Sequence, residues 1–206
     1  MNAGSRFQRY LASVRSKREG GVEPFGSPKD INDRTKIPIF QPIDLEYIIS
    51  DKELKKIYEV ADERQKLNTR NGIQERMNNI SYNESLWGHR TGAKAEYVFS
   101  KLFGKEWDSV SKITEDGYDF LFRYRDRFDL TVNVKGSEYL YPKLIVGRKS
   151  NILHVDIYYL VRTFGKLCKL MGWVWASEIF LPETIDYSLD FPNHAIPCKD
   201  LRKPSS

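Results

Sequence analysis

Acidic, amide and basic side chains gather on neighbouring segments in the middle of the chain. The segment DGYDF contains Asp119 between two aromatic residues, and the segment TVNVKGS contains Asn133 and Lys135. Glu96, on a preceding helical segment, adds a second carboxylate. Carboxylate and amide oxygens bind hard divalent cations, and a lysine ammonium stabilises negative charge that develops near it. These four residues are the candidate catalytic set.

The segment around Lys135 has the alternating pattern of a β-strand. Successive side chains of a strand point to opposite faces, so residues two apart share a face. The polar set is Asp129, Thr131, Asn133 and Lys135, and the apolar set is Leu130, Val132 and Val134. We therefore expect the polar groups to gather on one side of the sheet and the apolar groups to face a core.

The elements that must position these residues alternate between helix and strand. A charged helix is expected from about Ser50 to Leu67 with Asp51 as its cap, and a second from about Asn83 to Phe103, ended by Gly104. Strand-like runs are expected at 109–114, 118–124, 128–135, 143–146, 152–162 and 167–175, followed by a short helix at 177–179. This order predicts an α/β fold, bordering on α+β, with a mixed central sheet flanked by helices.

Composition sets the outer limits of the interpretation. The chain of 206 residues is 40% hydrophobic and 13% aromatic, which is ordinary for a globular protein, and it contains no apolar run of membrane-spanning length. Cys168 and Cys198 are far apart and form no CxxC pair, which argues against a zinc ribbon or a disulfide framework. We expect an intracellular, cytoplasmic protein, in the host cytoplasm if the chain is viral.

Positive charge is concentrated at the N-terminus. The formal net charge is +5, and the first 40 residues supply +4 of it, from eight Lys and Arg against four Asp and Glu. Apolar residues at helical spacing, surrounded by arginines, predict a basic amphipathic helix: Phe7, Tyr10, Leu11 and Val14. This helix could follow a phosphate backbone, dock on a protein partner, act as an organellar targeting signal, or belong to a mobile tail. We predict an extension at 1–42, made of this helix and a linker, and a compact domain at 43–206.

The ordered motifs resemble those of the PD-(D/E)XK nuclease superfamily, and most closely its small phage-type and prokaryotic members. The likeness rests on Gly-x-x-x-Glu on a helix (Gly92 and Glu96), then Gly-Tyr-Asp-Phe, then a strand that ends in acid-x-Lys at Lys135. Further matches are the segments GSEYL and LIV, the segment VDIY and the segment MGWV. The resemblance covers about Arg70 to Leu201 and implies a restriction-endonuclease-like fold.

The resemblance also implies roles for the candidate residues. Asp119 would be the principal ligand of Mg²⁺, with Mn²⁺ as a substitute, and Glu96 would bind the metal directly or through water. The backbone carbonyl of Val134 would assist as a further ligand. Lys135 would orient the attacking water or stabilise the transition state of phosphodiester hydrolysis. The implied function is a metal-dependent DNA endonuclease.

Asn133 departs from the family pattern, which has an acid at this position. An amide offers an oxygen but brings no charge, so the site would hold two carboxylates instead of three. We therefore expect weaker metal binding and an attenuated, rather than abolished, activity. A noncatalytic nucleic-acid-binding protein with the same fold is the main alternative.

Three cationic or titratable residues precede Glu96 on the same predicted helix. His89 shares the face of Glu96, and Arg90 and Lys94 are candidates for contacts with backbone phosphates. Each has a structural alternative: a hydrogen bond for His89, and simple solvation for the two cations. DNA is the expected partner. A homodimer and a protein partner for the N-terminal helix stay open, and a membrane is not expected.

Two other enzyme classes fit the sequence poorly. The chain has three histidines and no nucleophile elbow, which disfavours a Ser/His/Asp hydrolase. It also has no phosphate-cradling glycine pattern, which disfavours a P-loop or Rossmann nucleotide enzyme.

Overall fold

A computed structural model describes residues 42–70, 82–107, 117–124, 128–148, 155–189 and 192–204, all of which belong to the unit Phe40–Ser206. The predicted N-terminal helix and the predicted strand at 109–114 lie outside the described residues, so the expectations for them stay predictions.

Two long helices come first in this unit. Helix α3 (Asp51–Arg70) begins with Asp51 and Glu53 in its first turn, where carboxylates are favourable beside the free N–H groups. Helix α4 (Tyr82–Leu102) stops just before Gly104, whose φ of 60° belongs to the left-handed region that glycine adopts without strain. Both helices were predicted from the sequence to within a few residues at each end.

The main sheet has five strands in the order β1-β6-β5-β3-β2. The strands are β1 (Glu46–Ile48), β2 (Phe120–Tyr124), β3 (Phe128–Ser137), β5 (Ile157–Phe164) and β6 (Leu167–Trp175). β3 runs parallel to β5, and the other neighbours are antiparallel. The sheet is therefore mixed, as predicted.

A smaller sheet in the order β4-β8-β7 covers part of the main sheet. Its strands are β4 (Lys143–Val146), β7 (Ile185–Asp186) and β8 (Asn193–Pro197), with the short helices α5 (Ala176–Ile179), η3 (Pro182–Thr184) and η4 (Cys198–Asp200) nearby. β4 belongs to the connection that joins the parallel strands β3 and β5. Of these elements, only β4 and α5 were anticipated from the sequence.

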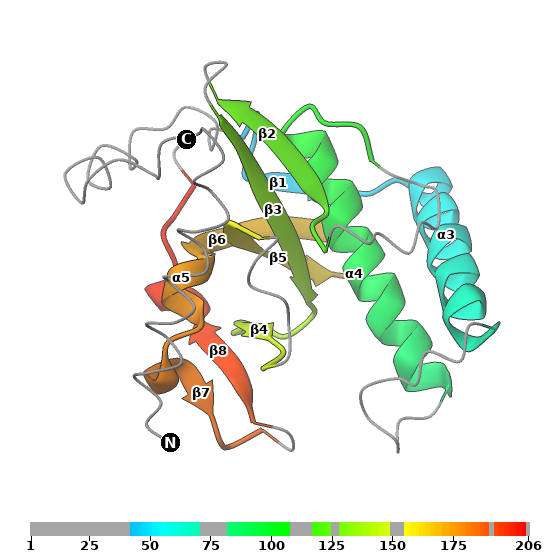
Figure 1. Cartoon of the computed structure of the whole chain (residues 1–206). Helices are drawn as coiled ribbons and strands as arrows, with labels where there is room; N and C mark the ends of the chain where they lie inside the picture. The colour runs from blue at the N-terminus through cyan, green and yellow to red at the C-terminus, as the bar shows by residue number, and fades with distance from the viewer. Residues whose placement is uncertain are drawn as a thin grey trace. The chain divides into compact units, whose positions relative to one another are not determined.

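Helix α4 covers one face of the main sheet, with α3 packed on α4, and the smaller sheet with α5 covers the other face (Figure 1). On the helix side, the ring of Phe99 in α4 packs against Phe120 and Tyr159, with ring centroids 4.9 and 5.1 Å apart. On the opposite side, Tyr158 and Leu160 join a second cluster with Leu144 of β4. Because β5 is buried on both faces, it is the centre of the fold.

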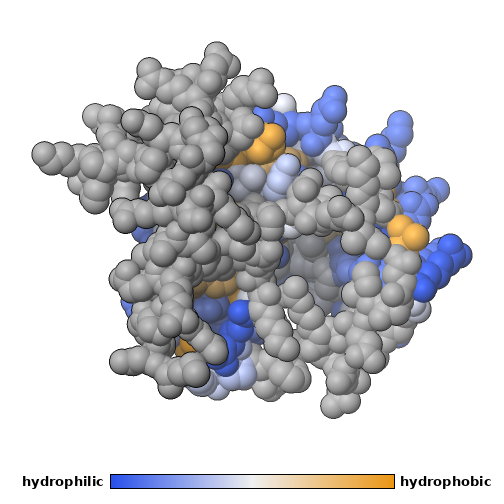
Figure 2. Space-filling view, viewed as in Figure 1, coloured by the Kyte–Doolittle hydropathy of each residue, from blue (hydrophilic) through white to orange (hydrophobic). Residues whose placement is uncertain are grey.

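Strand β3 shows the alternation that the sequence predicted. Leu130, Val132 and Val134 are almost fully buried, whereas Asn133 and Lys135 are partly exposed. The described part of the chain is thus an α/β arrangement of helices around a mixed sheet, and none of its helices is long and apolar enough to cross a membrane. The surface over α3 is mostly hydrophilic in the space-filling view (Figure 2).

Candidate active site

Asp119 lies immediately before β2, beside the neighbouring strand β3. Its N–H donates to the carbonyl of Val132 over 2.9 Å, which continues the hairpin ladder by one residue. Its side-chain Oδ2 accepts a hydrogen bond of 2.6 Å from the N–H of Val134. The carboxylate is thus held at the edge of β3, next to the residue that precedes Lys135.

Burial and nearby charges raise the pKa of Asp119 to about 7. Burial is the largest cause, and the negative charge of Glu96 adds to it. Lys135, the Val134 hydrogen bond and Arg64 act in the opposite direction. These effects require Glu96 and Lys135 to lie close to Asp119. The structure therefore brings together three residues that are far apart in the sequence.

A close contact between α4 and β3 allows this convergence. A Cβ on Gly136 would lie 2.5 Å from the carbonyl oxygen of Thr91 and 3.1 Å from the Cβ of Ala95. Only glycine lets the two backbones approach this closely. Glu96 follows Ala95 on α4, and Lys135 precedes Gly136 on β3, so the contact brings the segments that carry these two residues close together.

Arg64 of α3 is a member of the site that the sequence did not reveal. Its Nη1 is 2.7 Å from Oε2 of Glu96, and both side chains are about one-fifth exposed, at 24% and 18%. Arg64 also lowers the pKa of Asp119. On the sequence it is one of many charged residues in a polar helix, and no local pattern separates it from them. Only the antiparallel packing of α3 on α4 identifies it.

Asn133 lies on the same side of β3 as Lys135. Its Nδ2 donates to the carbonyl of Gly117 over 3.3 Å, and its Oδ1 is buried without a hydrogen-bond donor from the described residues. A buried amide oxygen without a donor is costly, because the group has lost its contact with water. Oδ1 is therefore a spare oxygen ligand close to the turn that holds Asp119.

These oxygen atoms are suitable ligands for a hard cation that binds few protein groups. The described residues contain no group of three or more His, Cys, Asp or Glu that could hold a metal. Mg²⁺ commonly takes only one or two carboxylates and keeps several waters, which matches Asp119 and Glu96 supplemented by Asn133 Oδ1 or the carbonyl of Val134. The Arg64 guanidinium competes with a cation for Glu96, so full engagement of Glu96 requires this ion pair to open or to be shared.

The other predicted binding residues lie elsewhere on α4. Arg90 forms a two-pronged ion pair with Asp62, with both N to O distances at 3.0 Å, so its guanidinium is already engaged. Lys94 is buried, with 3% of its surface exposed, and it pairs with Glu138 instead of reaching solvent. His89 is partly buried on α4. The structure does not gather these three residues around Asp119.

Asp156, directly before the parallel strand β5, has a structural role. Its Oδ2 accepts hydrogen bonds from the N–H and the Oγ1 of Thr131, at 3.0 and 2.9 Å. These bonds join the loop before β5 to β3, directly beside the candidate site. Asp156 thus fixes the register of the parallel pair that carries Asn133 and Lys135.

Comparisons with protein-family models, with curated proteins and with solved structures found no match to this chain.

Proposed function

We propose that this protein is a metal-dependent nuclease that hydrolyses phosphodiester bonds, with DNA as its substrate. One observation carries the proposal: Glu96, Asp119 and Lys135 come from three separate elements and interact electrostatically at one place. Two carboxylates and an ammonium at one point are the groups that metal-assisted phosphate chemistry requires. A carboxylate whose pKa is raised by burial and by a neighbouring carboxylate is typical of functional sites.

The order of the helices and strands also supports a nuclease. A helix, a β-hairpin and a third strand parallel to the second hairpin strand follow in the chain order α4, β2, β3 and β5. The candidate residues lie on the first three of these elements or directly beside them. The resemblance to PD-(D/E)XK nucleases implies this placement of acids and lysine, and a restriction-endonuclease-like fold is part of the proposal.

Each residue has a distinct chemical task in this mechanism. Asp119 and Glu96 would hold a Mg²⁺ ion with their carboxylates, and Asn133 Oδ1 would add a neutral oxygen. When bound, the ion would supply a Lewis acid and would lower the pKa of a water molecule bound to it. The ammonium of Lys135 orients the attacking water or stabilises charge on the scissile phosphate. Arg64 balances the charge of Glu96 when no cation is present.

The test is cleavage of plasmid, linear duplex, single-stranded and branched DNA with and without Mg²⁺ or Mn²⁺. We expect metal-dependent cutting by the natural protein and none by Asp119→Ala. Asp200→Ala, an acid-to-alanine change at an exposed residue outside the site, is the matched control and should keep cutting. Cutting that is equal in Asp119→Ala would remove that residue from the mechanism.

A noncatalytic nucleic-acid-binding protein is the second candidate. The ion pair between Arg64 and Glu96 favours it, because a protein cation already neutralises one of the two carboxylates. The neutral Asn133 favours it as well. Metal-independent DNA binding without cutting, unchanged in Asp119→Ala, would establish this alternative.

A further inference from the structure

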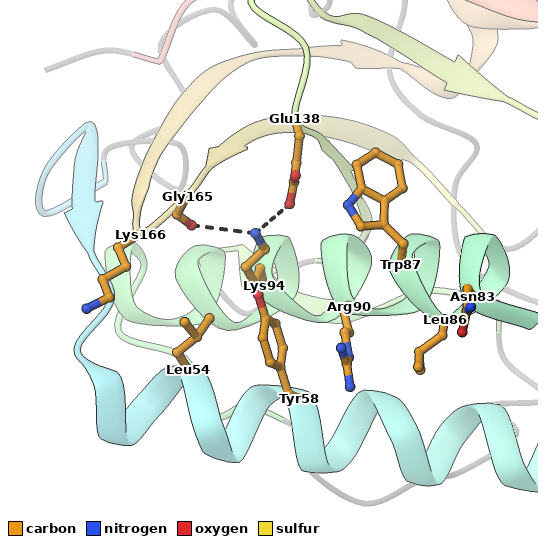
Figure 3. Close-up of a pocket in the computed structure, with 10 residues that line it drawn as sticks. All are labelled: Leu54, Tyr58, Asn83, Leu86, Trp87, Arg90, Lys94, Glu138, Gly165 and Lys166. Atoms are coloured by element: carbon orange, nitrogen blue, oxygen red, sulfur yellow. Dashed lines mark hydrogen bonds and ion pairs between the residues drawn. The ribbon is translucent and has the colours of Figure 1, made fainter.

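A pocket of about 510 Å³ lies between α3 and α4, away from the candidate catalytic residues (Figure 3). Leu54 and Tyr58 of α3 line one side, and Trp87, Arg90 and Lys94 of α4 line the other. Glu138, just after β3, and the turn between β5 and β6 complete the lining. The function proposed above uses none of these side chains.

A buried ion pair forms the floor of this pocket. The Nζ of Lys94 lies 2.5 Å from Oε1 of Glu138, and it also donates to the carbonyls of Thr163 and Gly165 over 3.3 and 3.5 Å. These partners use all three ammonium hydrogens, so Lys94 fixes Glu138 and has no donor left for a ligand.

Glu138 keeps one oxygen available. Its Oε1 accepts from Lys94 and, over 3.4 Å, from the hydroxyl of Thr91, whereas its Oε2 accepts no hydrogen bond from the described residues. The side chain is 26% exposed. Glu138 is therefore a positioned acceptor that is available to a group with N–H donors.

Aromatic surface lies beside this acceptor. Trp87 is 50% exposed, which is high for the largest apolar side chain, and Figure 3 shows its indole on the same side of α4 as Glu138. The guanidinium of Arg90 lies 4.7 Å from the centre of the Tyr58 ring. A flat ring can stack on such surfaces.

We propose that this pocket binds an unpaired nucleobase of the nucleic-acid substrate, stacked on Trp87, with an amino edge donating to Oε2 of Glu138. The proposal rests on the proposed function and narrows its substrate class to nucleic acid with unpaired nucleotides. A base inside a duplex cannot present both a free face and a free amino edge, because stacking and pairing use them.

Charge distribution argues against a free phosphate as the group that is recognised. The cations of the pocket already have carboxylate partners: Arg90 with Asp62, Lys94 with Glu138, and Lys166 with Asp51. A purely aliphatic ligand would bury Oε2 of Glu138 without a donor, which costs free energy. A ring with an amino group satisfies both the aromatic wall and the acceptor.

The test measures tryptophan fluorescence of the full chain, without metal, during titration with GMP, AMP, CMP, UMP, ribose 5-phosphate and inorganic phosphate. We expect quenching by GMP, AMP and CMP, weaker quenching by UMP, which has no exocyclic amino group, and none by the last two probes. Trp87→Phe should abolish the signal, and Trp175→Phe, a matched change far from the pocket, should keep it.

Calorimetry with the variants tests the two contacts separately. Trp87→Ala should weaken GMP binding by roughly tenfold or more, which is typical for the loss of one stacking partner. Glu138→Gln keeps an oxygen for Lys94 but presents an amide donor in place of Oε2, so it should weaken GMP binding while its melting temperature confirms folding. Equal binding of ribose 5-phosphate and GMP, or unchanged GMP affinity in Trp87→Ala, would overturn the proposal.

These measurements are independent of cleavage. Asp119→Ala, which should not cut DNA, is expected to bind GMP as the natural protein does. Nucleotide binding without any metal-dependent cutting would support the base-binding pocket and contradict the nuclease function. Metal-dependent cutting without nucleotide binding would support the nuclease function and contradict the base-binding pocket.

Discussion

Two partly buried carboxylates in this fold have opposite electrostatic surroundings. Burial raises the pKa of Glu53, but hydrogen bonds outweigh burial and lower it to about 2. The donors are the hydroxyls of Tyr47 and Tyr97, at 2.7 and 2.6 Å, and the N–H and hydroxyl of Ser50, at 2.9 and 2.6 Å. Glu53 is therefore a satisfied anion that joins β1 to the two helices.

The carboxylate of Asp119 is buried but lacks the many hydrogen bonds that offset the burial of Glu53. It accepts one backbone hydrogen bond, from Val134, and it lies close to the like charge of Glu96, so its pKa rises to about 7. The comparison shows what distinguishes a structural carboxylate from a candidate functional one. Glu53 is stabilised as an anion by the protein, whereas Asp119 needs a proton or an external cation.

Removing the ammonium group of Lys135, which lies beside Asp119, should have the largest effect on activity. Lys135→Met keeps a long, unbranched side chain but removes the ammonium, so we expect cleavage to fall by about 10² to 10³-fold, as for the loss of one charge-stabilising group. Steady-state cleavage rates give the effect, and circular dichroism tests the fold. Lys143→Met is the control, because that exposed lysine pairs with Asp186 outside the site. Unchanged cleavage in Lys135→Met would exclude a catalytic role.

Removing the charge of Glu53 should reduce stability without affecting cleavage. We expect Glu53→Gln to lower the free energy of unfolding by about 2 kcal/mol at pH 7, because hydrogen bonds to a charged group are worth roughly 1.5–3 kcal/mol. Urea denaturation gives the value, with the exposed Glu59→Gln on the same helix as control.

The stabilisation by Glu53 should depend on pH. Its pKa is lowered in the folded state, so its stabilisation is complete above the ordinary pKa of 4.5 and is lost as the pH falls toward 2. The difference between the natural protein and Glu53→Gln should shrink over that window. A constant difference from pH 7 to pH 3 would show that packing, not charge, causes the loss.

Neutralising Asp119 should have the opposite effect on stability. The folded state raises this pKa from 3.8 to about 7, so the native protein loses stability as the pH rises through that window. Asp119→Asn keeps an oxygen for the N–H of Val134 and removes the charge. We expect a gain of about 1–2 kcal/mol at pH 8 in metal-free buffer, less than the full shift implies because the side chain keeps some solvent contact. The gain should vanish near pH 4, and a loss of stability at pH 8 would contradict the assigned environment.

Adding a charge at Asn133 should have the smallest effect. Asn133→Asp provides a third carboxylate, so we expect Mg²⁺ to bind several-fold more tightly, a change of less than about 1.4 kcal/mol. The shift of the melting temperature with Mg²⁺ concentration measures the affinity without any substrate. An identical Mg²⁺ dependence in both proteins would place Asn133 outside the metal site.

Local patterns in the sequence predicted the elements around the site. The alternation along β3 placed Leu130, Val132 and Val134 in the core, and the strands at 143–146 and 167–175 have the predicted bounds. Strands β1 and β7 were missed, because runs of three and two residues are too short to show a period. The smaller sheet as a unit was therefore not foreseen.

Long-range ion pairs were beyond sequence reasoning. Lys94 was expected on an exposed helix face, in contact with backbone phosphates or simply solvated, but Glu138, far along the chain, allows it to be buried. Arg64 reaches Glu96 only because α3 packs on α4. Sequence patterns report the secondary structure and the face of each side chain, and such pairs depend on how whole elements pack together.

The short segment around Gly136 joins the two proposed sites, at Lys135 and at Glu138. Lys135 lies on β3, and Glu138 directly follows Ser137, the last residue of that strand, so the two are about 10 Å apart along the chain at the usual rise per residue of a strand. A base held at Glu138 and a phosphate held at Lys135 would thus be separated by a span that the strand sets. This fixed distance would keep the position of the cut, relative to the unpaired nucleotide, constant from one substrate to the next.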